Sequence, residues 1–241
     1  MDDPIVHQGH QNMSHLHDFI GGRNAQANST YASMQAGGTS CKTAGDTAGY
    51  WTPALYRNGV KVDPRGVSET GQKVRMRIYY NRSNLKKGTQ VMVPPADLRM
   101  IAGNSHATSS TDNPKLGREI YWGCSDNSTG KMTEPPTSCA TGIISLHVGF
   151  PNCWDGVLTH DDDTTHLTYP KSGVCRPPFV HPLPRIIMRW EYPVGTSTGA
   201  VLLSSGQTFT MHGDYWNTWD QAALTDLVQS CINADVSCGV R

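Results

Sequence analysis

The sequence lacks the features that would place the protein in a membrane or on nucleic acid. No apolar run approaches the roughly 18 residues that cross a bilayer as a helix. Basic and acidic residues are equal in number, 20 of each, so the chain has no formal net charge. Without an excess of cations, we expect no bulk attraction to nucleic acid or to anionic lipid.

Several motifs of well-known chemistry are also missing. The sequence contains no P-loop, no GxGxxG motif after a predicted strand and no HExxH motif. It has no CxxC pair, which argues against a zinc knuckle and a thioredoxin-type site. A nucleotide-dependent enzyme and a classical zinc protease are therefore not expected.

Turn-forming residues are abundant, with 24 glycines and 15 prolines. They predict many turns and few long helices. The length of 241 residues suits one large β domain, so we expect a single domain over residues 1–241. The first 50 residues are polar and rich in Gly, Ser, Asn and His. This segment is predicted to be mostly irregular and packed on the β core, with one short helix near Tyr31.

Short strands are predicted along the rest of the chain. In residues 74–80 and 186–192 every second residue is apolar. This period of two residues predicts strands with one face toward the core and the other toward solvent. Further strands are expected at residues 51–55, 91–93, 98–102, 121–124, 143–148, 201–203 and 208–211. An apolar stripe from Leu224 to Ile232 predicts a C-terminal α-helix, capped by Asn217 or Thr218. Together these elements predict a mostly β, antiparallel sandwich or jelly-roll-like domain with long irregular loops.

Seven cysteines bear on the cellular compartment. Their spacing suggests local bridges Cys124–Cys139, Cys153–Cys175 and Cys231–Cys238, with Cys41 left over, although Cys41 could replace any of these partners. The start of the sequence lacks the basic and apolar regions of a signal peptide. This fits either an intracellular protein or a mature secreted domain, and the cysteines favour the secreted one.

A first group of candidate functional residues is His15, His17 and Asp18. In an extended segment His15 and His17 point to the same side, as two metal ligands can. The alternative is a His-rich surface loop, since His7 and His10 lie nearby.

A second group is His212, Asp214, Tyr215 and Trp216, predicted to lie between the last strand and the final helix. An imidazole beside a carboxylate can bind a metal or transfer protons near neutral pH. The two aromatic residues could form a platform on which a sugar stacks. The alternative is that Asp214 satisfies backbone N–H groups at the start of the helix while the aromatic rings pack in the core.

A third group lies in the middle of the chain and contains Trp154, Asp155 and His166. A Cys153–Cys175 bridge would hold this loop rigid. The acidic run that follows does not match the calcium-binding EF-hand pattern. Asp155 could be functional or could stabilise a turn by a hydrogen bond.

These motifs resemble a secreted family known as domain of unknown function nineteen ninety-six, from fungi and actinobacteria, sometimes fused to WSC-type glycan-binding modules. The resemblance covers almost the whole chain. It rests on residues 3–6, 14–19, 50–56, 98–103, 150–156, 166–170, 203–206 and 212–216. The family usually has a second histidine where this chain has Asp163, and His160 could compensate. The resemblance implies secretion and a cell-wall glycan setting, without an established reaction.

The leading functional hypothesis is a secreted glycan hydrolase. Glycoside cleavage commonly uses two carboxylates about 5–9 Å apart, and Asp155 and Asp214 are the candidate pair. This hypothesis needs all three groups to meet in one cleft. The other predicted catalytic residues are His212, His166 and Asp18, and the predicted substrate contacts are Trp154, Trp216 and Tyr215.

Two alternatives belong to other classes of protein. One is a mononuclear metal enzyme, in which His15 and His17 bind Zn or Cu together with His166 or with one or two of His166, His181 and His212. The other is a non-catalytic module that binds cell-wall polysaccharide. In each case we expect a monomer with a glycan partner.

Overall fold

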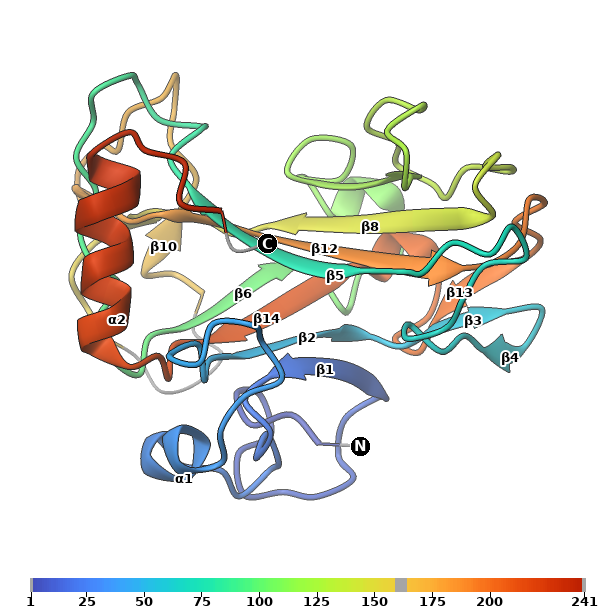
Figure 1. The fold of residues 1–241 in the computed structure, drawn as a ribbon, viewed down its shortest axis with the longest axis horizontal. Helices are drawn as coiled ribbons and strands as arrows, with labels where there is room; N and C mark the ends of the chain where they lie inside the picture. Colours follow the sequence, from blue (N-terminus) through green and yellow to red (C-terminus); the bar gives the residue numbers. More distant parts are fainter. Residues whose placement is uncertain (1, 159–163, 240–241) are drawn as a thin grey trace.

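The computed structural model describes residues 2–158 and 164–239. Two four-stranded antiparallel sheets form the body of the molecule (Figure 1). The first sheet has the order β1-β2-β14-β6, and the second has the order β5-β12-β8-β7. The first comprises β1 (His17–Gly21), β2 (Gly49–Pro53), β14 (His212–Trp216) and β6 (Arg99–Gly103). The second comprises β5 (Met76–Asn81), β12 (Arg185–Pro193), β8 (Ile143–Gly149) and β7 (Ile120–Cys124).

The two sheets pack face to face, which confirms the predicted antiparallel, mostly β architecture. Gly213 of β14 faces the second sheet. A Cβ at this position would lie 2.4 Å from the Met188 side chain of β12 and 3.1 Å from the Val148 side chain of β8. Glycine at this position lets β14 pack against the second sheet without displacing these two side chains.

The predicted alternation in residues 186–192 is clear in β12. Ile186, Met188, Trp190 and Tyr192 are fully buried toward the first sheet. Since successive side chains of a strand point to opposite faces, Arg189 and Glu191 lie on the outer face of the second sheet. This outer face carries a polar network described below.

Two smaller sheets and the helices extend this sandwich. One small sheet has the order β10-β9-β11 and the other β13-β3-β4. Their strands are β3 (Leu55–Arg57), β4 (Val60–Lys61), β9 (Cys153–Trp154), β10 (Leu167–Thr168), β11 (His181–Pro182) and β13 (Val201–Leu203). The helical elements are α1 (Tyr31–Ala36), η1 (Ser110–Asp112), η2 (Thr208–Thr210), α2 (Gln221–Asp226) and η3 (Leu227–Asn233).

The structure corrects several local predictions. Residues 212–216 form strand β14 rather than a loop, and residues 208–210 form a 3₁₀ turn rather than a strand. No strand is formed at residues 91–93. The N-terminal 50 residues are less irregular than expected, since they contribute β1 along the full length of β2.

The final helix begins later than predicted, with Asp220 as its N-cap. The Asp220 carboxylate accepts a hydrogen bond from the Ala223 amide at 2.8 Å. Asn217 and Thr218 cannot serve as caps because their side chains bind elsewhere. Asn217 donates to the Pro94 and Pro95 carbonyls, and Thr218 donates to the Thr47 carbonyl.

Three disulfides are present, Cys124–Cys139, Cys153–Cys175 and Cys231–Cys238, as the spacing predicted. Cys41 is the free cysteine. Of the helices in the described part of the chain, none is long and apolar enough to span a membrane.

Candidate functional site

Three histidines meet at one end of the first sheet. His17 is the first residue of β1, and His212 is the first residue of β14. His15 lies two residues before His17, on the side that the extended backbone predicts. The centroid of the His15 ring lies 4.3 Å from that of the His17 ring and 5.0 Å from that of the His212 ring. We call His15, His17 and His212 the histidine cluster.

Hydrogen bonds to the backbone orient two of these imidazoles. The Nδ1 atom of His212 lies 2.8 Å from the Thr210 carbonyl, and the Nδ1 atom of His17 lies 3.4 Å from the Asp2 carbonyl. A carbonyl can only accept, so each Nδ1 carries the proton and each Nε2 keeps its lone pair. The Nε2 atom of His17 is buried and has no hydrogen-bond partner in the described part of the structure.

Two carboxylates lie beneath the histidine cluster. The Oδ2 atom of Asp3 is 4.0 Å from the His17 Nε2, and the Oδ2 atom of Asp214 is 4.0 Å from the His212 Nε2. The other oxygen of Asp3 accepts hydrogen bonds from the amides of Ile5 and Val6, which fixes the carboxylate in place. Donor atoms of Asp3, His17 and Asp214 lie within 4.8 Å of one another.

Burial dominates the electrostatics of this region. Removal from water lowers the pKa of His17 and His212 to about 3 and also lowers the pKa of His15. Burial, followed by the nearby charge of Asp3, raises the pKa of Asp214 well above its usual value. The imidazoles are therefore neutral at physiological pH, the form in which histidine binds a metal.

The surroundings leave one side of the cluster open. His17, His212, Asp3 and Asp214 are buried, and Asp214 is only 1% exposed. His15 is partly exposed. A ligand from solvent would therefore reach the cluster at the edge occupied by His15.

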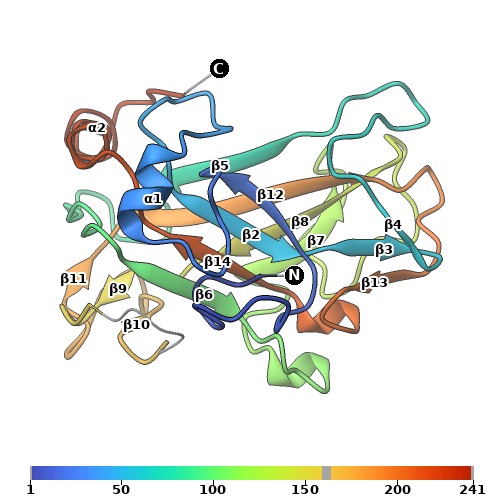
Figure 2. The same ribbon diagram turned by 90° about the horizontal axis from the view of Figure 1, so that it is seen from below.

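The middle group of predicted residues lies elsewhere. Asp155 follows β9, and its Oδ2 atom lies 2.7 Å from the Nδ1 of His166, which immediately precedes β10. In both views β10, which pairs with β9, lies at the end of the molecule that carries α2, whereas β13, which precedes β14 in the chain, lies at the opposite end (Figures 1 and 2). The structure pairs Asp155 with His166, and among the described residues no hydrogen bond or ion pair joins either of them to Asp214. The predicted roles of His160 and Asp163 concern positions outside the described residues.

The remaining predicted residues have structural partners. Asp18 points away from its neighbour His17 along the strand and forms an ion pair with Lys61 at 2.7 Å. Tyr215 and Trp216 are fully buried. Tyr215 packs in the main core, and the Trp216 ring packs against Ile5 and Trp51.

The burial of these two rings means that neither presents a face on which a sugar could stack. Trp154 is 8% exposed, and its indole donates to the Val157 carbonyl. The tilted ring of His181 lies 5.9 Å from that of Trp154. In this structure all three aromatic residues serve the packing of the protein.

A GxSxG spacing is present at residues 195–199, although the motif requires a strand followed by a helix. Here the segment follows β12 and leads into β13, a strand. Ser197 therefore does not lie on a nucleophile elbow.

The family model "Domain of unknown function (DUF1996)" matches residues 3–219. The chain belongs to the DUF1996 family. No curated protein and no solved structure matches it significantly.

Sequence reasoning missed one member of the candidate site in this DUF1996 domain, Asp3. The family resemblance could have pointed to Asp3, because residues 3–6 are the first of the segments on which that resemblance rests. No local pattern could show that this carboxylate would lie beside His17 and beside Asp214, which follows Asp3 by more than 200 residues.

Proposed function

We propose that the protein binds one Zn or Cu ion through His15, His17 and His212. The observation that carries the proposal is the convergence of one nitrogen from each imidazole, all within 4.8 Å of one another. In a tetrahedral zinc site with Zn–N bonds of about 2.0–2.1 Å, two ligand nitrogens lie about 3.3 Å apart. The Nε2 atoms of His15 and His212 are separated by 3.2 Å.

The two carboxylates support a cation at this position. In the described part of the chain, neither Asp3 nor Asp214 forms an ion pair with a lysine or an arginine. The Oδ2 atom of Asp214 is buried and has no hydrogen-bond partner among the described residues. An ionised buried carboxylate without a counter-charge is costly, so Asp214 favours its protonated form in the absence of a cation, and a metal ion would stabilise the ionised form.

We further propose that the metal centre acts outside the cell on cell-wall polysaccharide, the substrate class that the family resemblance implies. Three disulfides support an oxidising compartment. Three imidazoles with an accessible edge at His15 suit a metal that keeps a position for substrate or water. A hydrolase based on Asp155 and Asp214 has less support, because the two carboxylates belong to separate groups.

Calorimetric titration of chelator-treated protein, produced without a His-tag, tests the metal site. We expect one equivalent of Zn²⁺ or Cu²⁺ to bind, and His212→Ala to weaken binding at least about a hundredfold through loss of a ligand. His10→Ala, which removes an exposed histidine of the same segment, is the matched control. The proposal fails if the protein shows no saturable binding or if His212→Ala binds as tightly as the unaltered protein.

Incubation with insoluble β-glucan and chitin tests the proposed activity. We expect the metal-loaded protein to release soluble sugars and the metal-free protein to release none. Retention on the polysaccharide without any product over a long incubation would instead identify a binding module.

A further inference from the structure

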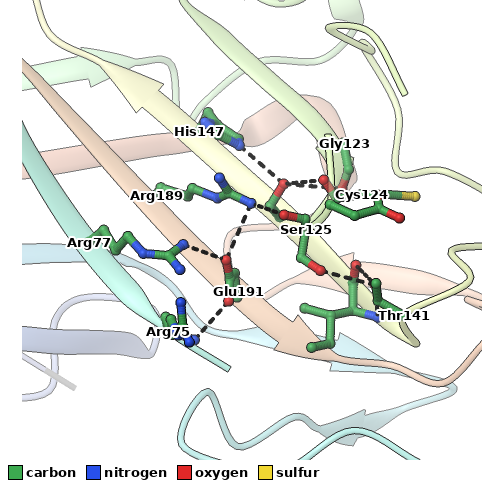
Figure 3. Close-up of polar contacts among 12 residues, drawn as sticks. Arg75, Arg77, Gly123, Cys124, Ser125, Thr141, His147, Arg189 and Glu191 are labelled. Carbon is green, nitrogen blue, oxygen red and sulfur yellow. Dashed lines mark hydrogen bonds and ion pairs between the residues drawn. The ribbon is translucent and has the colours of Figure 1, made fainter. Parts of the chain in front are cut away.

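A second polar site lies on the outer face of the second sheet, away from the histidine cluster. A pocket of about 480 Å³ opens there, between the β5 and β12 strands and the loops that flank β7 and β8. Its polar lining includes Lys73, Arg75, Arg77, Ser125, Thr141 and Glu191. We call this site the arginine pocket (Figure 3).

A buried carboxylate organises the arginine pocket. The Glu191 side chain is 5% exposed and lies 2.7 Å from the Nη1 of Arg77 and 3.3 Å from the Nη2 of Arg189. Its second oxygen accepts a hydrogen bond from the Arg75 amide at 2.9 Å. Figure 3 shows the two guanidinium groups of Arg77 and Arg189 directed at this one carboxylate. Glu191 therefore holds them in fixed positions, a preorganised arrangement for binding a further anion.

The pocket has more cations than its carboxylates can neutralise. Lys73, Arg75, Arg77 and Arg189 surround two carboxylates, Glu191 and Asp126, and Glu191 is already shared by Arg77 and Arg189. Within the described residues, neither the Arg75 guanidinium nor the Lys73 ammonium has a hydrogen-bond or ion-pair partner. This local excess of positive charge occurs in a chain with no formal net charge.

The uncharged polar side chains that line the arginine pocket indicate which class of anionic ligand it could bind. The hydroxyl groups of Ser125 and Thr141 lie 3.0 Å apart, and the Gln72 amide also lines the pocket. Such groups can donate to and accept from sugar hydroxyls. None of the described residues that line the pocket has an aromatic side chain on which a nucleobase could stack, which disfavours a nucleotide.

We propose that the arginine pocket binds the carboxylate of an acidic saccharide. The free guanidinium of Arg75 and the exposed face of Arg77 would receive the carboxylate, and Ser125 and Thr141 would contact the sugar hydroxyls. This proposal is independent of the metal centre, because the two sites use different residues on different sheets.

Binding of tetragalacturonic acid to the full chain, measured by calorimetry after treatment with a chelator, tests the proposal. We expect saturable binding that Arg75→Gln weakens about tenfold, the effect of losing one charge-assisted hydrogen bond. Lys73→Gln should weaken it several-fold. Both substitutions leave the contacts of Glu191 in place, so the fold should be unaffected. Arg23→Gln, an exposed arginine after β1, is the matched control and should bind normally.

Ligand controls separate the carboxylate from the sugar. The methyl ester of the same tetrasaccharide should bind at least about tenfold more weakly, because it keeps the hydroxyl groups but lacks the charge. The proposal is overturned if the acid does not bind at millimolar concentration, if its ester binds equally well, or if Arg75→Gln has no effect. Inorganic sulfate that binds as tightly as the tetrasaccharide would overturn the assignment to a saccharide.

Discussion

The histidine cluster and the arginine pocket both surround buried carboxylates, but they balance that charge differently. In the arginine pocket, Glu191 faces two guanidinium groups. Beside the histidine cluster, Asp3 and Asp214 face imidazoles that burial keeps neutral. The arginine pocket thus has cations in excess, whereas the carboxyl groups beside the histidine cluster have no lysine or arginine partner among the described residues.

This difference indicates what each site would bind. A metal ion would compensate Asp3 and Asp214, whereas an anion would compensate the free cations around Glu191. Substitutions that remove one carboxylate at a time should therefore have different consequences in the two regions.

The largest effect on stability is expected for Glu191→Gln. This change leaves the partly buried Arg77 and the buried Arg189 without a counter-charge, so the free energy of unfolding should fall by roughly 3–5 kcal/mol. Urea unfolding followed by circular dichroism measures the difference. A loss below about 1 kcal/mol would show that Glu191 does not compensate these guanidinium groups.

A smaller effect is expected at Asp46, a buried carboxyl held by neutral groups. Both of its oxygens accept from the Tyr50 hydroxyl, at 2.9 and 3.1 Å. Burial raises the pKa of Asp46 from 3.8 to about 7. The folded state therefore keeps this proton over a range in which the unfolded state loses it, and stability decreases as pH rises from 3.8 through about 7.

Asp46→Asn should remove this part of the pH dependence. Between pH 5 and pH 8 the unaltered protein should lose about 3 kcal/mol more than the variant, the value of two pKa units. Urea unfolding at the two pH values gives this difference directly. Equal losses in the two proteins would place the pKa of Asp46 near that of an exposed carboxyl.

Asp214→Asn tests the histidine cluster both without a metal ion and with one bound. Because the raised pKa favours the protonated carboxyl, the neutral amide should change the stability of metal-free protein by less than about 1 kcal/mol. Metal affinity should nevertheless fall about 10- to 100-fold, since the carboxylate beside the ligands is lost. Thermal unfolding with and without metal measures both quantities. An unchanged metal affinity would mean that Asp214 does not compensate the ion.

The smallest effect is expected for Asp155→Asn. It weakens the partly exposed pair with His166 and should change stability by at most about 1 kcal/mol. Metal affinity at the histidine cluster should stay within about twofold of the original, because Asp155 belongs to a separate part of the molecule. A large fall in metal affinity would instead support the single cleft that the sequence suggested.

The sequence predicted the second sheet better than the first for a physical reason. Strands β5 and β12 alternate between core and outer faces, so the pattern of their side chains is visible locally. Strands β2 and β14 are buried at every position and show no such alternation. Strand β14 also contains His212 and Asp214, polar residues that suggest a loop until the neighbouring strands are known.

The candidate site was only partly predictable for a related reason. His15 and His17 are two residues apart, so an extended backbone alone places them on one side. The position of His212 beside them depends on the order β1-β2-β14, and that of Asp3 depends on a turn at Ile5 and Val6. Pairing between distant segments cannot be read from local spacing, which is why Asp155 was grouped with Asp214.

The metal content of the protein tests the central claim most directly. Elemental analysis of protein secreted without a His-tag, and purified without a chelator, should find about one equivalent of Zn or Cu in the unaltered protein. It should find much less in a variant with alanine at His15, His17 and His212. Absence of a bound transition metal from the unaltered protein, even after addition of Zn²⁺ or Cu²⁺ and gel filtration, would contradict the account.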